Sequence, residues 1–261
     1  MKRITILTLF IEMFDGFMSN SIIKRAIAKG LVEIKLVNIR DYTLDKHHRV
    51  DSAPIGGGAG LIMKCQPLVD ALMANKNDNS HVILSSPRGA KYNQKKAREL
   101  NEKYDDIIIV CGHYEGIDER FNKYVDEMIS IGDYILTGGE LASMVISDSI
   151  IRLIDGAIAE ESIVDESFEN ETLEYPQYAE PYDFNGDKVP DILYSGNHTA
   201  IDKYHRKQSL LLTKELRPDL FAKLKLSKQD IKLLKEAEDK EQPKWEKDAL
   251  EKGKKFIKKD N

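Results

Sequence analysis

The apolar run IIIVC at residues 107–111 leads directly into a glycine-rich loop, and this pairing restricts the folds open to the chain. Five successive apolar residues are typical of a strand that is buried on both faces, as in parallel sheets covered by helices. Strand-like and helix-like patterns alternate through the first 150 residues. This alternation predicts an α/β domain with a mostly parallel sheet.

Hydrophobic periodicity locates the expected elements of this domain. We expect strands at residues 4–10, 32–38, 81–84 and 107–111, and helices at residues 21–29, 66–74, 93–103 and 140–153. Later in the chain, Ser227 is expected to cap a helix, because its hydroxyl and the carboxylate of Asp230, three residues on, can satisfy the first free N–H groups.

Charge is distributed unevenly along the chain, although the formal net charge is only −5. Residues 1–152 hold 20 basic and 20 acidic residues, residues 153–187 hold 11 acidic residues and no Lys or Arg, and residues 188–261 hold 19 basic and 13 acidic residues. Because the C-terminal third is basic, the overall acidity does not exclude a polyanionic partner such as nucleic acid.

These patterns divide the chain into three predicted parts. Residues 1–158 form the α/β domain, residues 159–187 form an acidic mobile linker, and residues 188–261 form a small helical domain. The linker is predicted because an acid-rich segment with little periodicity repels itself and buries little surface. No apolar run approaches the roughly 18 residues needed to span a bilayer. We also find no signal peptide, so we expect a cytoplasmic protein without a membrane partner.

The Cys and His residues argue against two classes of site. Two cysteines, Cys65 and Cys111, do not suffice for a disulfide scaffold or a thiolate zinc finger. The neighbouring residues His47 and His48 point to opposite sides of a strand, and no second His pair supports zinc. We therefore predict no metal-binding residues.

Three glycine-bearing loops carry the main chemical signal. They read PIGGGAG at residues 54–60, VCGHYEGIDER at residues 110–120 and SIGDYILTGGE at residues 130–140. Glycine lets a ligand approach the backbone closely, and ligands of α/β sheets bind beyond the carboxyl ends of strands. None of the loops matches G-x-G-x-x-G or G-x-x-x-x-G-K-[ST], which argues against a Rossmann dinucleotide site and a P-loop.

Five segments occur in a characteristic order: RDYTLDKHHRVDSAPIGGGAGLIM, LSSPRGAKYNQ, VCGHYEGIDER, SIGDYILTGGELA and SGNH followed by KQSL. Over about residues 1–235 the chain resembles the bacterial tRNA (guanine-N1)-methyltransferase family, which modifies guanosine 37 beside the anticodon. The resemblance implies the SPOUT fold, in which the α/β domain ends in a deep trefoil knot, an exception to the rule that chains are unknotted. It also implies a homodimer with active sites shared between the two chains.

The resemblance implies that S-adenosylmethionine binds bent inside the knot. The expected cofactor-binding residues come from the three loops that follow strands, and they are Ser85, Ser86, Pro87, Gly89, Gly112, Tyr114, Glu115, Ile131, Gly132, Asp133, Tyr134, Ile135, Leu136, Gly138 and Gly139. Residues 131–136 supply an apolar wall and backbone groups that can read adenine. Glu115 is expected at the ribose hydroxyls or at the methionine end.

Methylation of guanine N1 sets the remaining requirements. This nitrogen bears a proton and has a delocalised lone pair, whereas a sulfonium methyl group is already activated. The reaction needs a general base at N1, positive charge or donors at O6, and in-line placement of the reactants. The resemblance places the base just before a Ser-Phe dipeptide and the cation on the helix after the knot. The matching residues are Glu166 and Arg152.

Position 166 departs from the family, which has Asp before the Ser-Phe dipeptide. Here Glu166 stands at that position and Asp165 precedes it. Glu166 can take the proton if the linker backs off by about one ångström, and a mobile linker can instead bring Asp165 into place. The base is therefore Glu166, Asp165 or neither.

RNA contacts are expected from two regions of the chain. The expected substrate-binding residues are Asp51, His47, Gly57, Gly58, Ser195, His198 and Arg206, of which Asp51 is a candidate to read the edge of the target guanine. The helix at residues 91–103 and Lys203, Lys207 and Arg217 are candidates for phosphate contacts. The family's tryptophan in the C-terminal domain is replaced by Tyr204 and His205. Any Mg²⁺, which the family has been linked to, would be shared with the tRNA or the linker carboxylates.

Two other functions remain open at this point. A SPOUT enzyme that methylates a ribose hydroxyl or another RNA base would keep the cofactor loops but need a different pocket. A non-catalytic RNA-binding protein would keep the fold after loss of the base. Mapping of the methylated nucleoside distinguishes the first alternative from a guanine-N1 methyltransferase. A single-turnover assay of methyl transfer distinguishes the second.

Overall fold

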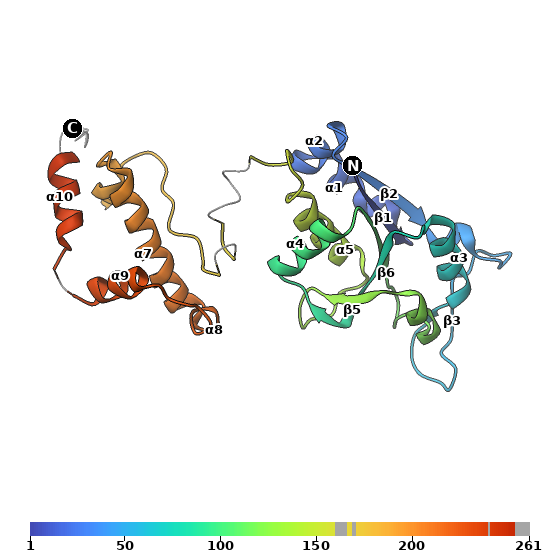
Figure 1. Ribbon diagram of the computed structural model, residues 1–261. Coiled ribbons are helices and arrows are strands. Elements are labelled where there is room, and N and C mark those ends of the chain that lie inside the picture. Colours follow the sequence, from blue (N-terminus) through green and yellow to red (C-terminus); the bar gives the residue numbers. More distant parts are fainter. Residues whose placement is uncertain (160–165, 169–170, 240, 254–261) are drawn as a thin grey trace. The chain divides into compact units, whose positions relative to one another are not determined.

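The computed structural model describes residues 1–159, 166–168, 171–239 and 241–253, and the chain divides into two units, Met1–Ile163 and Val164–Asn261. The first unit is built on a five-stranded sheet with the order β2-β1-β6-β5-β7 (Figure 1). The strands are β1 (Lys2–Thr8), β2 (Val32–Asn38), β5 (Ser80–Lys91), β6 (Asp106–Cys111) and β7 (Glu127–Ser130). All four pairings are parallel, which confirms the predicted α/β class.

Helices and short elements connect these strands. The α-helices are α1 (Asp15–Ser19), α2 (Ser21–Ala28), α3 (Cys65–Asn75), α4 (Gln94–Lys103) and α5 (Glu140–Ile151). The 3-10 helices are η1 (Ile11–Phe14), η2 (Ile39–Tyr42) and η3 (Glu119–Tyr124), and the two-residue strands β3 (Asp51–Ser52) and β4 (Ile62–Met63) pair antiparallel. Each helix and strand expected in this region has a counterpart, and apart from the end of β5 the limits agree within a few residues.

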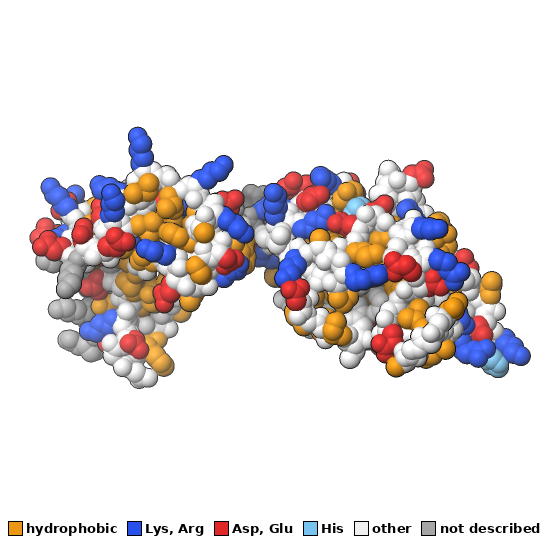
Figure 2. Space-filling view, turned by 90° about the horizontal axis from the view of Figure 1, so that it is seen from below, with side chains coloured by type: hydrophobic (Ala, Val, Ile, Leu, Met, Phe, Trp, Pro, Cys, Tyr) orange, Lys and Arg blue, Asp and Glu red, His pale blue; other side chains and the backbone are white. Residues whose placement is uncertain are grey.

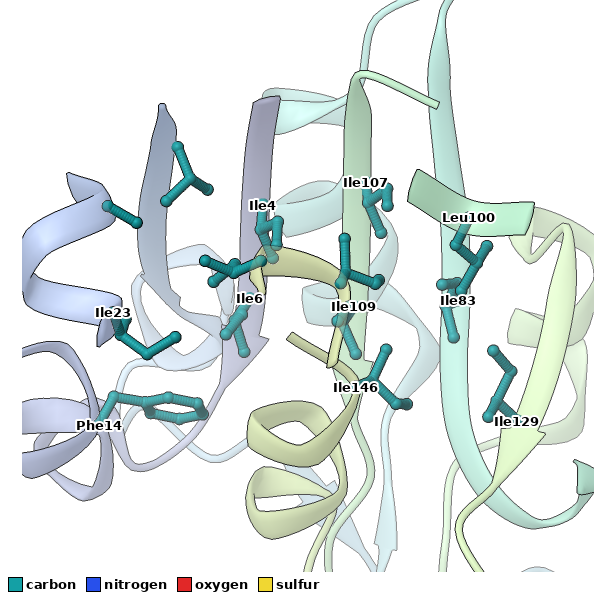
Figure 3. Close-up of a cluster of buried hydrophobic side chains, with 14 of the residues drawn as sticks. Ile4, Ile6, Phe14, Ile23, Ile83, Leu100, Ile107, Ile109, Ile129 and Ile146 are labelled. Atoms are coloured by element: carbon teal, nitrogen blue, oxygen red, sulfur yellow. The ribbon is translucent and has the colours of Figure 1, made fainter. Parts of the chain in front are cut away.

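β6 fills the middle of the core because both of its faces are covered. Ile107 and Ile109 point into a cluster formed with α2, α4 and α5, which includes Ile146 of α5 (Figure 3). Ile108 and Val110 point into the opposite cluster, which includes Leu72 of α3. These four strand residues are fully buried, and each such side chain contributes about 1.5–3 kcal/mol of hydrophobic stabilisation. The continuous apolar run of β6 is thereby explained, because alternate side chains enter opposite clusters and both clusters are apolar.

β5 is longer than the sequence predicts. The expected strand ends at residue 84, whereas β5 continues to Lys91 with an irregularity between Ser85 and Ala90. Pairing with β7 resumes at Ala90, opposite Ile129. The polar residues after Ser85 hide this continuation from an analysis based on hydrophobicity.

The second unit contains η4 (Asp191–Tyr194), α7 (His198–Leu216), α8 (Pro218–Phe221), α9 (Lys228–Glu238) and α10 (Lys244–Gly253), together with the hairpin β8 (Asp183–Phe184) and β9 (Asp187–Lys188). The predicted cap of α9 is confirmed. Ser227 Oγ accepts the N–H of Asp230 at 3.1 Å, and Asp230 Oδ2 accepts the N–H of Ser227 at 3.0 Å.

Residues 173–175 of the predicted linker pack against α7. The N–H of Leu173 donates to Thr213 Oγ1 at 2.9 Å, and Ser209 Oγ donates to the Leu173 carbonyl at 2.5 Å. The ring of Tyr175 stacks on that of His205 with a centroid distance of 3.6 Å. Residues 171–175 thus belong to the packing of the second unit.

Candidate functional site

Three loops meet at the carboxyl-terminal edge of the sheet. β5, β6 and β7 are adjacent in the order β6-β5-β7, and Ser85 of β5 pairs with Cys111 at the end of β6. The segment after β7 returns to the loop after β6, because the N–H of Gly139 donates to the carbonyl oxygen of Gly112 at 2.8 Å. The loops after β5, β6 and β7, from which the expected cofactor residues come, are therefore in contact with one another.

A cavity of 670 Å³ lies where these loops meet. Its volume is within the range of roughly 300–1,000 Å³ that small-molecule sites occupy. Thirteen of the fifteen expected cofactor residues line it, namely Ser85, Ser86, Pro87, Gly112, Tyr114, Glu115, Ile131, Gly132, Tyr134, Ile135, Leu136, Gly138 and Gly139. The motifs therefore meet around one cavity.

The remaining two expected residues, Gly89 and Asp133, do not line the cavity. A Cβ atom at Gly89 would lie 2.4 Å from the backbone nitrogen of Ile129, so this glycine lets the end of β5 pass close to β7. The carboxylate of Asp133 is exposed and lies 2.5 Å from Lys91 Nζ. Both residues shape the surroundings of the cavity.

The cavity has further lining residues that the sequence analysis did not name. They are Leu84, Arg88, His113, Gly116, Ile117, Glu119, Ile129, Ser130, Thr137 and Ala142. All of them lie within the quoted motifs except Ile129, which directly precedes one, so their place in the motifs could have identified them. Ala142 is the last residue of its motif and reaches the cavity from the first turn of α5.

Gly139 stands at the tightest point between the loops. A Cβ atom there would lie 2.2 Å from Ser85 Oγ, 2.8 Å from the Cα of Cys111 and 2.9 Å from the nitrogen of Gly112. Two of these three atoms belong to the backbone, so no side chain fits without movement of the loop after β6. The close approach explains why this position needs glycine.

An apolar rim borders the cavity. Tyr134, Ile135 and Leu136 expose 54%, 81% and 36% of their surfaces, values that are high for large apolar residues. The hydroxyl of Tyr134 donates to the carbonyl of Ile131 at 3.3 Å. Tyr134 is thus not a core aromatic residue, and the rim offers apolar surface to a ligand.

A buried polar cluster supports the loop after β7. Glu140 is 2% exposed, and Thr8 Oγ1 donates to its Oε1 at 2.8 Å. Cys111 Sγ lies 3.3 Å from Ser143 Oγ. Burial, and secondarily the nearby Glu140, raises the pKa of the Cys111 thiol, so this cysteine is an inert core residue. These contacts tie β1, β6 and α5 together beneath the cavity.

Tyr114 joins the cavity to the candidate substrate residue Asp51. Burial, and then a hydrogen bond with the Asp51 carboxylate, raises the pKa of the Tyr114 hydroxyl. Arg40 Nη2 also donates to this hydroxyl at 3.5 Å. Tyr114 lines the cavity, so Asp51 stands at its border.

The loop at residues 54–60 is anchored beside Glu115. The N–H of Glu115 donates to the carbonyl of Leu61 at 3.0 Å, and the Glu115 side chain occupies the space where a Cβ at Gly60 would stand. Gly57 and Gly58 have positive φ values of 88° and 134° and are exposed. They therefore form an open turn next to a cavity residue.

His47 is not among the residues that line the cavity. Its N–H donates to Asp45 Oδ1 at 2.8 Å, and its side chain is exposed. The side-chain hydrogen bonds from Arg49 keep the pKa of Asp45 well below its usual value. His47 thus projects from a turn that is closed by an ion pair.

The candidate catalytic residues are divided between the two units. Arg152 is the C-cap of α5, and its N–H donates to the Asp148 carbonyl at 3.0 Å. Glu166 is half-buried at the start of the second unit, where Ser167 Oγ accepts the N–H of Glu174 at 3.0 Å. Asp165 lies outside the described residues.

The C-terminal candidates differ in what their side chains contact. Ser195 is 4% exposed, and its Oγ accepts the N–H of Asn197 at 3.2 Å, whereas His198 is exposed on the first turn of α7. Arg206 donates two hydrogen bonds to Asp230, at 2.8 and 3.2 Å, which lower the pKa of that carboxyl group. Arg206 therefore links α7 to α9.

Basic side chains are interspersed with acidic ones on the visible faces of both units (Figure 2). Arg217, another phosphate candidate, is paired with Asp219 at 2.8 Å. Among the described residues there is no group of three or more His, Cys, Asp or Glu side chains that could hold a metal ion. None of the described helices has the length and apolar character needed to cross a membrane.

Comparison with known proteins adds independent information. The model of the family described as "tRNA (Guanine-1)-methyltransferase TrmD" matches residues 1–223. A tRNA (guanine-N(1)-)-methyltransferase of Clostridium perfringens is 57% identical over 235 residues, which are 89% of this chain and 99% of that protein. Proteins of the same name from Clostridium botulinum and Clostridium beijerinckii are 53% and 52% identical, over 89% and 91% of this chain and 98% and 100% of their own lengths.

The match extends over most of the chain and contains all three loops that line the cavity. The resemblance that the motifs indicated is thereby confirmed, and this chain belongs to the tRNA (guanine-N1)-methyltransferase family.

Proposed function

We propose that this chain transfers a methyl group from S-adenosylmethionine to N1 of guanosine 37 in tRNA, with a carboxylate as general base. The observation that carries this proposal is the single cavity formed by the loops after β5, β6 and β7. Family membership supports the reaction, since the relatives are named as tRNA (guanine-N1)-methyltransferases.

The cavity residues fit S-adenosylmethionine. Gly138 and Gly139 let the segment after β7 pack tightly against its neighbours, because a Cβ atom at either position would clash with protein atoms. A Cβ atom at Gly112 would meet no protein atom closer than 3.6 Å, so at this residue the cofactor can lie against the backbone. The apolar rim and the backbone of residues 131–136 suit an adenine ring. Glu115 is placed to accept hydrogen bonds from ribose hydroxyls or to orient the methionine end. When bound, S-adenosylmethionine supplies a methyl group whose bond to the sulfonium sulfur breaks as the bond to N1 forms.

The chain's own residues provide the proton chemistry. Glu166 or Asp165 takes the proton from guanine N1 as general base. The guanidinium of Arg152 stabilises the negative charge that builds at O6. Asp51, hydrogen-bonded to Tyr114, accepts hydrogen bonds from the N–H groups at the edge of the guanine. Because N1 is a poor nucleophile, loss of the base should remove nearly all turnover.

The proposed function includes a knotted first unit, a tRNA-binding second unit and a homodimer. The contact between the loops after β6 and β7 supports a trefoil knot, and the helices after residue 188 support a helical tRNA-binding domain. We propose a cytoplasmic homodimer with shared active sites. We propose that the linker predicted at residues 159–187 brings its carboxylates to the site when the anticodon stem-loop binds, as in other substrate-driven closures, while residues 171–175 keep their packing in the second unit. Any Mg²⁺ is shared with the RNA or the linker carboxylates.

RNA binding uses residues that remain exposed. His198 on α7 and the exposed glycines of the 54–60 loop are the first candidates, whereas Lys207 on α7 is half-buried. Arg206 acts mainly through Asp230, and Ser195 through the turn that it closes. The target base must leave its stack to reach the cavity.

The decisive experiment identifies the methylated nucleoside. Transcribed tRNA is incubated with the protein and S-adenosylmethionine labelled in the methyl group, and the digest is separated by chromatography. We expect label in 1-methylguanosine at position 37 and none in tRNA with adenosine at that position. Label in a ribose or in another base would favour the alternative SPOUT reaction. Absence of transfer in single-turnover conditions, with tRNA still bound, would favour the non-catalytic RNA-binding protein.

A further inference from the structure

The helix α10 lies beyond the residues that define the family. The family model ends at residue 223, and the Clostridium perfringens relative is matched over 99% of its own length but 89% of this chain. α10 nevertheless packs within the second unit, beside α7 and α9 (Figure 1). The family model therefore does not account for the contacts of α10.

The apolar face of α10 completes a small core. Ala249 is fully buried in a cluster with Ile192 of η4 and Ala200 of α7. Trp245 and Leu250 of α10 pack against the same cluster. Without α10 this side of η4 and of the start of α7 would lose its apolar covering.

The end of α10 presses on the turn before α7. A Cβ atom at Gly253 would lie 2.5 Å from the Cα of Ser195, so the two backbones are in direct contact. Ser195 Oγ accepts the N–H of Asn197, and Asn197 Oδ1 accepts the N–H of Ala200 as the cap of α7. The position of α10 thus controls how α7 begins.

Trp245 connects three helices. Its Nε1 donates to Glu236 Oε2 of α9 at 2.9 Å, and the ammonium group of Lys203 on α7 lies 5.9 Å from the centroid of its ring. A cation held over an aromatic face in this way is restricted in direction. The exposed face of α10 carries Lys244, Lys247 and Lys252 beside Asp248 and Glu251, a balance of charge that does not favour direct phosphate binding.

We propose that α10 is a positioning element for the RNA substrate. Gly253 fixes the turn at Ser195 and Trp245 directs Lys203, so that His198 and Lys203 meet the RNA backbone in one arrangement. This inference rests on the proposed function, because it assigns the exposed start of α7 to the tRNA. α10 itself does not touch the reacting groups.

The test uses the full chain with single substitutions. Trp245→Ala should raise the KM for tRNA about fivefold, with little change in kcat or in S-adenosylmethionine affinity. Trp245→Phe keeps an aromatic ring and should restore most of the affinity. Lys203→Ala should also raise KM, and the double variant should be no worse than Lys203→Ala alone. Glu251→Ala, on the exposed face of α10, is the matched control and should behave as the wild type.

Three results would overturn the inference. The first is an unchanged KM for tRNA in Trp245→Ala. The second is a double variant in which the KM increases of Trp245→Ala and Lys203→Ala multiply. The third is a rise of KM in Lys247→Ala as large as in Trp245→Ala, which would indicate that α10 contacts the RNA directly. If Trp245→Ala melts below the assay temperature, the comparison of Trp245→Phe with the wild type decides, with a KM rise of about twofold expected from its lost bond to Glu236. A wild-type protein that does not methylate tRNA would instead refute the proposed function.

Discussion

The close packing at Gly139 makes Gly139→Ala a sharp test of the proposed cofactor site. The new methyl carbon would lie 2.8 Å from the Cα of Cys111 and 2.9 Å from the nitrogen of Gly112, whereas ordinary contacts begin at 3.4 Å. Ser85 Oγ can rotate away, but the two backbone atoms must move by about 0.6 Å with the loop after β6. Overpacking of this kind costs about 1–3 kcal/mol.

We expect this strain to appear as lost cofactor affinity, because the loop that must move lines the cavity. The corresponding loss in S-adenosylmethionine affinity is about 5-fold to 150-fold. Isothermal titration calorimetry measures the affinity, and a thermal melt separates it from general destabilisation. Gly16→Ala is the matched control, because no atom lies within 4 Å of a Cβ at that position.

Gly112→Ala distinguishes packing from direct obstruction. Its Cβ would meet no protein atom closer than 3.6 Å, yet Gly112 lines the cavity. We therefore expect weaker S-adenosylmethionine binding with an almost unchanged melting temperature. Wild-type affinity in both Gly139→Ala and Gly112→Ala would refute the assignment of this cavity to the cofactor. An unchanged melting temperature and affinity in Gly139→Ala alone would refute the packing argument.

The remaining predictions concern catalysis and pH. Glu166→Gln combined with Asp165→Asn should lower kcat by at least about 100-fold while cofactor affinity stays within a few-fold, and retained turnover would refute the base assignment. Arg152→Ala should lower single-turnover rates about 100-fold without a change in the circular dichroism spectrum; a normal rate would remove Arg152 from the mechanism. Asp230 has a lowered pKa because Arg206 bonds to it, so it stabilises the fold above its unfolded pKa of about 3.8 and loses this effect as pH falls further. Asp230→Asn should therefore lower the melting temperature at pH 7, with a gap to wild type that narrows below about pH 4; a gap independent of pH would contradict the ion-pair argument.

Four of the five strands of this sheet, all except β7, were expected from sequence, because an alternating or continuous run of apolar residues marks a strand. Residues 32–38 were expected as a strand and form β2 with those same limits. β6 was evident because all of its residues are buried. The extension of β5 was not accessible, since residues 86–91 show no apolar pattern and its end is defined by the pairing of Ala90 and Lys91 with β7.

The cavity was largely predictable and the role of individual charges was not. The cofactor residues came from the resemblance of the motifs to the family, and the position of their loops beyond the carboxyl ends of parallel strands agrees with the general rule for α/β sheets. The partner of a charged side chain depends on the tertiary fold. Arg206 was expected among the substrate-binding residues, and its pairing with Asp230 on another helix could not be foreseen. The buried bond between Thr8 and Glu140 joins residues 132 positions apart. No local pattern encodes such choices.

The distribution of the proposed chemistry over two units has a mechanistic consequence. The cofactor cavity and Arg152 belong to the first unit, whereas Glu166 belongs to the second. A general base must come within hydrogen-bond reach of the proton that it takes, so the proposed mechanism draws on residues of both units, whether of one chain or of the two chains of the proposed homodimer. The residues expected at the cofactor all belong to the first unit. Under the proposed function, substitution of Glu166 therefore lowers turnover and leaves S-adenosylmethionine affinity unchanged, so the two properties are separable by mutation.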